Sequence, residues 1–500
     1  MLLWFVILYL MLSVGIGLWA ATRVHSAKDF AVAGRSLPLP VVTATVFATW
    51  FGAEAVFGIP ATFVQEGLGG VVADPFGSSM CLILAGIFFS TKLYKLNILT
   101  LGDFYRMRYN RTVEVITTIC IVLSYLGWVA AQIKALGLIF NLVTGGPVSQ
   151  ETGMILGAAI VLTYTTFGGM FSVAFLDFVQ MLVSMGGLMF IAWKVSAMTG
   201  GVAPVIEHAA HAGKLQFLPK GGDPWLWVTF LGAWVTMMLG SIPQQDVFQR
   251  ITSAKSSRIA IGGSFLGASI YFCFTFVPMF IAYAATLLEP DKFAGIIARD
   301  SQLVLPMLVL DSMPLFAQVL FFGAVLSAIM SCSSATLLAP SVTFAENVVR
   351  GFYPRMGNHT FLKVMRGCLV GFALLVLAFA LNSESSIFKM VENAYKVTLA
   401  GAFVPLVFGA FWKRATTQGA LVATIGGLLS WLMIEIMIGE ASPVPPQLIG
   451  LGISAIGMLA GSLLPQRIGH KHPPPPGFLH EHAAYAHSGI HPHHPSGAGR

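Results

Sequence analysis

The chain has 500 residues, of which 56% are hydrophobic and only 10% are charged, with a formal net charge of +7. Soluble domains carry about 25% charged residues, so this composition indicates a polytopic membrane protein and not a soluble enzyme or a nucleic-acid-binding domain. Five cysteines lie in apolar runs without metal-type spacing, and we expect them to be buried free thiols.

Hydrophobic runs bounded by charges predict an all-α protein with about thirteen spans. They fall near residues 2–20, 38–64, 71–91, 113–143, 152–167, 173–197, 225–248, 259–287, 303–345, 362–381, 386–412, 417–438 and 447–464. The first run lacks a basic segment before it and is predicted to be a retained span, not a signal peptide. The run 303–345 is too long for one crossing. We expect an external helix over Ser301–Met313, broken at Pro306 and Pro314, and then a span from Leu315.

The basic residues predict the orientation of the chain. Most of the 28 Lys and Arg residues lie in alternate loops, around residues 23–35, 92–111, 250–258, 350–366 and 413–414, and in the tail. The positive-inside rule then places the N-terminus outside and the C-terminus in the cytoplasm of a plasma (inner) membrane protein. Residues 465–500 are rich in Pro and His, and we expect a disordered tail, with weak metal binding as the alternative.

The stretch Val41–Gln65 is long and apolar enough to span a bilayer, but Gly52, Gly58 and Pro60 interrupt it and Glu54 lies near its middle. Broken backbone and a carboxylate at this depth are tolerated only where they line a protein interior or a cavity. The pattern predicts an unwound helix that holds an ion and a polar solute.

A second stretch, Trp225–Arg250, is apolar and then broken at Gly240–Pro243, just before Gln244 and Gln245. Two interrupted helices in corresponding positions favour an inverted-repeat transporter, although two unrelated kinked helices would give the same pattern. We expect a transmembrane domain over residues 1–464. It would contain an extra helix at 1–20, repeats at 38–197 and 225–412, and two extra helices at 417–464.

A third polar cluster lies on one apolar helix, over Leu326–Asn347, and contains Ser327, Ser331, Ser333, Ser334 and Thr336. Such hydroxyls bond back to helix carbonyls or join neighbouring helices in many membrane proteins. The alternative is that they supply hard oxygen ligands to an alkali cation.

Several motifs in a fixed order resemble the sodium:solute symporter family, which has the leucine-transporter-type fold with a 5+5 inverted repeat. They are KDFAVAGRSLP (28–38), FATWFGAEAVFG (47–58), TLGDFYRMRYN (100–110), YTTFGGMFSVAFLDFVQ (164–180), IPQQDVFQR (242–250), SAIMSCSSATLLA (327–339) and AFVPLVFGAFWKR (402–414). Within the family these motifs look most like the choline-transporter branch and its bacterial relatives.

The resemblance implies a sodium site made by two carbonyls of the first broken helix and by a carbonyl and hydroxyls of the later serine-rich helix. Carried over, the ligands are Ala48, Phe51, Ala328 and Ser331, with the fifth position on Cys332. A neutral thiol is a poor sodium ligand, so a neighbouring Ser333, Ser334 or water is the expected substitute. Asp177 matches a position that bears on a second cation or a proton.

The same resemblance implies aromatic residues around a quaternary ammonium, since ring faces attract cations. Trp50 and Trp128 match two such positions, and the third falls on Gln244 instead of Trp. With Gln245 and Glu54 nearby, the pattern suggests a solute that is smaller or more polar than choline. The expected solute site is completed by Phe57 and by Gln132, one turn beyond Trp128.

We therefore expect sodium-coupled symport of a small organic solute (an amine or other organic cation, an amino acid or a carboxylate) by alternating access. Its partners would be sodium, the solute and the lipid bilayer, with no nucleic acid. The alternatives are a proton-coupled symporter, a membrane solute sensor and a passive channel. An enzyme is not expected, because the sequence has neither a zinc-type His pair nor a hydrolytic dyad.

Overall fold

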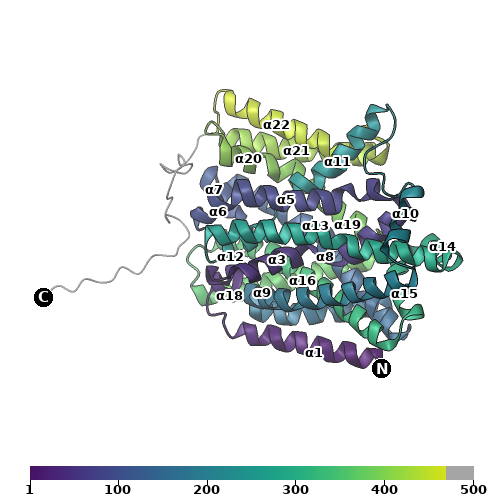
Figure 1. Ribbon diagram of the computed structural model, residues 1–500. Helices are drawn as coiled ribbons and strands as arrows, with labels where there is room; N and C mark the ends of the chain where they lie inside the picture. The colour runs from purple at the N-terminus through teal and green to yellow at the C-terminus, as the bar shows by residue number, and fades with distance from the viewer. Residues whose placement is uncertain (469–500) are drawn as a thin grey trace.

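The computed structural model describes residues 1–468, and within that range the chain forms a bundle of helices (Figure 1). Eleven helical segments are long and apolar enough to cross a membrane, or up to 13 if each bent helix pair is one span. The expected all-α membrane architecture is therefore confirmed. The long unbroken helices are α1 (Leu2–Ala21), α8 (Arg111–Thr144), α13 (Ser257–Leu288), α16 (Leu315–Phe344), α18 (Asn358–Asn382), α21 (Thr417–Met437) and α22 (Pro446–Leu463).

Two helix pairs are sharply bent. In the first, α3 (Leu39–Trp50) is followed by a π-helical turn, η2 (Glu54–Gly58), and by α4 (Ile59–Glu66), with a bend of 58°. In the second, α11 (Pro224–Gly240) is followed by α12 (Gln245–Ser253), with a bend of 45°. These are the two discontinuous helices predicted from Gly and Pro, and they begin the stretches expected to form the two repeats.

The predicted spans 152–167 and 173–197 form the two legs of one 49-residue helix, α9 (Gln150–Met198). The legs meet at Gly169, whose φ of 49° and ψ of −141° are not helical. A Cβ atom there would lie 2.5 Å from the carbonyl oxygen of Phe30, so both the backbone and the space at this position require glycine.

The other elements connect or extend these spans. In the first half they are α2 (Ala27–Val32), η1 (Ala33–Arg35), η3 (Leu68–Val71), η4 (Val72–Gly77), α5 (Ser78–Leu84), η5 (Ala85–Phe89), α6 (Ser90–Leu96), α7 (Leu101–Arg108) and α10 (Val202–His211). In the second half they are α14 (Pro290–Asp300), η6 (Ser301–Leu303), α15 (Val304–Ser312), η7 (Ala345–Val349), α17 (Arg350–Phe352), α19 (Ile387–Thr398), η8 (Leu399–Phe403), α20 (Val404–Phe411) and η9 (Gly439–Ala441).

The long run near residue 303 divides as expected into a separate helix and a span that begins at Leu315, but one expected break was wrong. Pro306 lies inside α15, at its third residue, where a helix has no intrahelical partner for the missing N–H. The chain instead breaks at Met313 and Pro314, between α15 and α16.

The centre of the bundle is formed by α3, α8, α9, α13 and α16, which contact one another. α1 lies along one edge and α21 and α22 along the opposite edge (Figure 1). Small residues allow the close approach of α13 to α3, because Cβ atoms at Gly263 and Gly267 would meet Val42 and Val46 at 2.4 and 2.6 Å. α13 therefore packs closely against α3 in the turns that precede the break. Most of the predicted Pro/His-rich tail lies outside the described residues.

Candidate functional site

The break in α3 frees main-chain carbonyl groups. In an α-helix the carbonyl of Ala48 would accept a hydrogen bond from the amide of Gly52. That amide instead bonds to the carbonyl oxygen of Trp50, at 3.0 Å, because Phe51 leaves the helical conformation (φ −80°, ψ 76°). The next amide, of Ala53, bonds to Oε1 of Gln132 on α8, at 2.8 Å. The carbonyl of Ala48 therefore lacks its helical hydrogen bond, because the amide of Gly52 is directed to Trp50.

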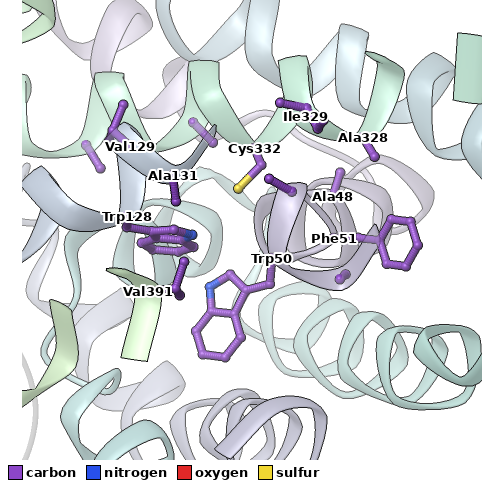
Figure 2. Packing of buried hydrophobic residues seen from close by; sticks show 14 of the residues in the cluster. Ala48, Trp50, Phe51, Trp128, Val129, Ala131, Ala328, Ile329, Cys332 and Val391 are labelled. Carbon is purple, nitrogen blue, oxygen red and sulfur yellow. The ribbon is translucent and has the colours of Figure 1, made fainter. Parts of the chain in front are cut away.

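Gly52 allows α3, α8 and α16 to meet at this break. A Cβ atom at Gly52 would lie 2.5 Å from Oε1 of Gln132 and 2.6 Å from Cβ of Cys332. Figure 2 shows Cys332 directed toward the end of α3 that carries Ala48, Trp50 and Phe51. The expected position of Cys332 beside the unwound segment is therefore the one that it occupies.

Oxygen atoms gather between α3, α9 and α16. The hydroxyl of Ser331 lies 3.5 Å from the carbonyl oxygen of Ala48 and donates a hydrogen bond to Asp177. Thr45, one turn before Ala48 on α3, donates to the other carboxylate oxygen of Asp177. Ala328 and Ala48 face each other across the gap between the two helices (Figure 2). Two carbonyl-bearing residues, two hydroxyls and a carboxylate thus surround one buried point, which suits a hard alkali cation.

The other hydroxyls of α16 have different roles. Ser333 donates to the carbonyl of Ile329 at 2.6 Å, Ser334 to that of Ser331 at 2.9 Å, and Thr336 to that of Cys332 at 2.8 Å. Each of these hydroxyls bonds back to its own helix. Ser331 is distinguished from them because its hydroxyl reaches across to α9 and α3.

A buried arginine lies next to this group. Arg250 on α12 is 1% exposed, and one of its terminal nitrogens lies 4.0 Å from Oδ2 of Asp177. The same guanidinium interacts electrostatically with Asp246 on its own helix. The second bent pair therefore brings a positive charge close to the carboxylate of Asp177.

Five aromatic side chains, which we call the aromatic cluster, lie beside the break: Trp50, Tyr125, Trp128, Tyr271 and Tyr395. Trp50 contacts Trp128 edge to face with ring centroids 6.2 Å apart, and Tyr395 lies 6.3 Å from Trp50 and 5.6 Å from Trp128. Tyr125 stacks on Trp128 at 5.7 Å, and Tyr271 meets Trp50 edge to face at 6.5 Å. The cluster draws residues from α3, α8, α13 and α19.

Three carboxyl groups border the aromatic cluster. Asp246 accepts hydrogen bonds from Nε1 of Trp50, at 3.1 Å, and from the hydroxyl of Tyr125. Asp74, in η4, accepts one from the hydroxyl of Tyr271 at 2.7 Å and another from Ser78. Glu54, the first residue of η2, is also buried, at 4% exposed.

The model of the sodium:solute symporter family matches residues 30–427 of the chain. The chain belongs to the sodium:solute symporter family. Among curated relatives, the human high affinity choline transporter 1 is 26% identical over 444 residues, which cover 85% of this chain and 75% of that protein. The Escherichia coli sodium/pantothenate symporter is 27% identical over 473 residues, which span 92% of this chain and 96% of that protein.

Solved structures show the same fold. A Na⁺-coupled sialic acid symporter in a substrate-bound, outward-open state superposes with a TM-score of 0.78 at 19% identity, over 93% of this chain and 97% of that one. The nucleobase-cation-symport transporter Mhp1 superposes with a TM-score of 0.57 at 14% identity. Family membership and fold together make this chain a sodium-coupled solute symporter.

The symporter brings together most of the residues expected at its solute site, but not all. Trp50, Trp128 and Glu54 lie at the aromatic cluster or its border. Gln244 reaches α8 one turn before Trp128, where its Nε2 donates to Ser124 at 2.9 Å. Gln132 accepts a hydrogen bond from the amide of Ala53, in the unwound segment.

One of the expected solute residues is directed elsewhere. Oε1 of Gln245 accepts from the amide of Leu101, at 2.8 Å, so this side chain is directed to the start of α7 and away from the aromatic cluster. Phe57 lies in η2 and is buried, at 1% exposed. Sequence reasoning missed Thr45, Asp74, Asp246, Tyr271 and Tyr395, although Asp246 stands inside the quoted IPQQDVFQR motif.

Proposed function

We propose that the symporter binds sodium between α3 and α16 and carries it inward together with a small organic solute by alternating access. The observation that carries this proposal is the freed carbonyl of Ala48, which faces the hydroxyl of Ser331. The proposed ligands are the carbonyls of Ala48, Phe51 and Ala328 and the hydroxyl of Ser331. Cys332 occupies the fifth position with its thiol.

Asp177 is proposed as the charged member of the site. Its two oxygens accept hydrogen bonds from Ser331 and Thr45, so a cation bound at Ser331 would lie within reach of a formal negative charge. The same carboxylate is the candidate position for a second cation. A proton held on Asp177 is the alternative coupling ion, because a buried carboxyl group next to hydroxyl donors can bind a proton in place of a metal ion.

The aromatic cluster is proposed as the solute site. It is joined to the proposed sodium site through α3, since Ala48 contributes a carbonyl to one site and Trp50 a ring to the other. Sodium that orders the break would place Trp50 for the solute, and the coupling is then reciprocal in free energy. The solute classes compatible with this arrangement are those expected from the sequence: amines, amino acids and carboxylates.

We propose that the N-terminus lies outside and that the C-terminal end lies in the cytoplasm. The first residue of α1 and the loops near α6, α7 and α12 lie at opposite ends of the bundle (Figure 1). The basic residues Lys92, Arg108, Arg111 and Arg250 all belong to the second end, and a concentration of Lys and Arg favours the cytoplasmic side.

A thermal unfolding experiment on the purified full chain tests the sodium site without knowledge of the solute. Ligands that bind only the folded state raise the unfolding temperature. We expect NaCl to raise it relative to KCl at equal ionic strength, and Ser331→Ala to remove most of that difference. Ser333→Ala is the matched control, because its hydroxyl bonds only to its own helix.

Two outcomes would count against the site. If Ser331→Ala and Ser333→Ala respond equally to sodium, the cation is not bound at Ser331. If acidification to pH 5 stabilises the wild-type chain as strongly as sodium does, and Asp177→Asn removes that effect, protons are the coupling ion. Both measurements use the same protein and require no transport assay.

A further inference from the structure

The buried arginine of α12 uses few of its hydrogen-bond donors. Arg250 is 1% exposed, and its Nε and Nη2 atoms have no hydrogen-bond partner within residues 1–468. Its Nη1 donates to the sulfur of Met170 on α9, at 3.7 Å. Buried polar groups are normally paired, and a guanidinium stays charged in a protein. An arginine in this position therefore needs a negative charge nearby.

Asp177 supplies that charge without accepting a hydrogen bond from the arginine. Oδ2 of Asp177 lies 4.0 Å from Nη2 of Arg250, and no other carboxylate of the described residues lies within 4.0 Å of this guanidinium. The carboxylate is 0% exposed, and its two oxygens accept hydrogen bonds from the hydroxyls of Thr45 and Ser331. Arg250 thus balances the charge of Asp177 at a distance, while the oxygens stay directed to the hydroxyls of the proposed sodium site.

Sodium and Arg250 would have to share one negative charge. The hydroxyl of Ser331, a proposed sodium ligand, bonds directly to Asp177, so a sodium ion at this hydroxyl would lie close to the same carboxylate. One carboxylate balances only one of the two positive charges. Two cations in a buried site repel each other strongly, because the protein interior screens charges poorly. Bound sodium and the arginine therefore compete for Asp177.

We propose that Arg250 is a built-in competitor of sodium: its guanidinium balances the charge of Asp177 in the sodium-free chain and gives up that role when sodium binds. The arginine thereby lowers the affinity for sodium. It also spares the sodium-free chain a buried carboxylate without a counter-charge, which would be strongly destabilising. A symporter has to release sodium and return empty, and a balanced charge on Asp177 favours both steps. This proposal rests on the sodium site proposed above.

The arginine keeps an acidic neighbour when sodium takes Asp177. Asp246 precedes Arg250 by four residues on α12, and residues four apart lie on the same face of a helix. Asp246 also accepts a hydrogen bond from Nε1 of Trp50, at 3.1 Å. A guanidinium released from Asp177 would therefore act on the carboxylate that holds a ring of the aromatic cluster. The competition thus gives sodium a route to the proposed solute site through α12.

Thermal unfolding of the purified full chain, with NaCl titrated against KCl at constant ionic strength, tests the competition. Arg250→Met keeps an unbranched side chain and removes the charge. We expect half-maximal stabilisation at a sodium concentration at least about tenfold lower than in the wild type. We also expect the unfolding temperature of this variant to be lower than that of the wild type in KCl and to recover in saturating NaCl. An arginine with a merely structural role would not lower the sodium concentration required.

Two further variants show whether the charge and its partner carry the effect. Arg250→Lys keeps the positive charge and should require a sodium concentration close to that of the wild type. In the Asp177→Asn background, Arg250→Met should lower the unfolding temperature in KCl much less than it does alone, because no charge remains to be balanced. An unchanged or higher sodium requirement in Arg250→Met, or an equal loss in both backgrounds, overturns the proposal. If Arg250→Met alone does not fold, Asp177→Asn should restore folding, and failure to do so also overturns it.

Arg350→Met is the control for the same chemical change, because Arg350 also pairs with a carboxylate, that of Glu346 at 2.9 Å, but in a different part of the bundle. It should change the unfolding temperature equally in NaCl and KCl and leave the sodium requirement as in the wild type. The failure of this proposal is distinguishable from failure of the sodium site. A normal sodium response of the wild type without a gain of affinity in Arg250→Met would refute only the competition, whereas a wild-type chain without any response to sodium would refute the sodium site itself.

Discussion

Nε1 of Trp50 donates a hydrogen bond to Oδ2 of Asp246, at 3.1 Å, and this bond joins the two bent helix pairs close to their breaks. Trp50 is the last helical residue of α3, and Asp246 is the second residue of α12. A side chain that we propose to bind solute through its ring is thus held by the other bent pair through its ring nitrogen. The position of Trp50 therefore depends on both halves of the molecule.

Removal of this donor should weaken the link between the bent pairs. Trp50→Phe keeps an aromatic ring but leaves Asp246, which is fully buried, without one of its partners. We expect a loss of about 1–3 kcal/mol in stability, seen as a lower unfolding temperature. Trp193→Phe is the control, because its ring is 62% exposed on the outer surface. Equal unfolding temperatures for the two variants would show that the hydrogen bond contributes nothing.

Gln132 should control sodium binding although it is not a proposed ligand. Gln132→Leu removes the acceptor for the amide of Ala53 and favours rewinding of the helix, which would return the carbonyl of Ala48 to an intrahelical bond. We expect a sodium-dependent rise in unfolding temperature that is much smaller than in the wild type. Gln132→Glu retains an acceptor oxygen and should keep more of the response. A full sodium response in Gln132→Leu would contradict this role.

Because the packing at Gly52 is close, we expect the single methyl group of an alanine at this position to lower the stability of the protein. Gly52→Ala places a Cβ atom 2.5 Å from Oε1 of Gln132 and 2.6 Å from Cβ of Cys332, and we expect a cost of about 1–3 kcal/mol as the helices separate. Gly323→Ala on α16 is the matched change, since nothing lies within 4 Å of its added atom. It should be neutral or slightly stabilising. Comparable unfolding temperatures would refute the packing argument.

A substitution at Cys332 tests whether this position contacts sodium, and here we expect the affinity for sodium to rise. Cys332→Ser replaces a thiol with a hydroxyl, an oxygen donor that an alkali cation prefers. We expect half-maximal thermal stabilisation at a lower sodium concentration than in the wild type. Cys332→Ala removes the donor altogether and separates this effect from a change in packing. If the Ser and Ala variants respond alike, position 332 does not contact the ion.

The breaks in the two bent pairs could be predicted from the sequence, because Gly and Pro interrupt long apolar runs there. A break of this kind depends on the residues at the break itself. The proposed sodium site was inferred from motifs, and Ser331 stands out in the structure because its hydroxyl donates a hydrogen bond to Asp177 of α9. Which of the neighbouring serines would do so depends on helix rotation relative to α3 and α9. That rotation is a property of the packed bundle.

The missed residues have a common reason. Tyr271 and Tyr395 come from spans far apart in the sequence, and a buried tyrosine in an apolar run looks the same whether it packs in a core or lines a binding site. Asp74 precedes a proline at a helix start and has the local pattern of a turn. Gln245 shows the opposite error. It is adjacent to Gln244 in sequence, but Gln244 is the extended residue before α12 whereas Gln245 is the first residue of that helix, and its side chain is directed to α7.

The contact among Gly52, Gln132 and Cys332 has a consequence for how this chain can change over evolutionary time. No volume is left at their meeting point, so a larger residue at 52 requires a smaller one at 132 or 332 before the helices can close again. Substitutions at these positions are therefore not independent in their effect on stability. Among relatives that keep the break in α3, these three positions should vary together.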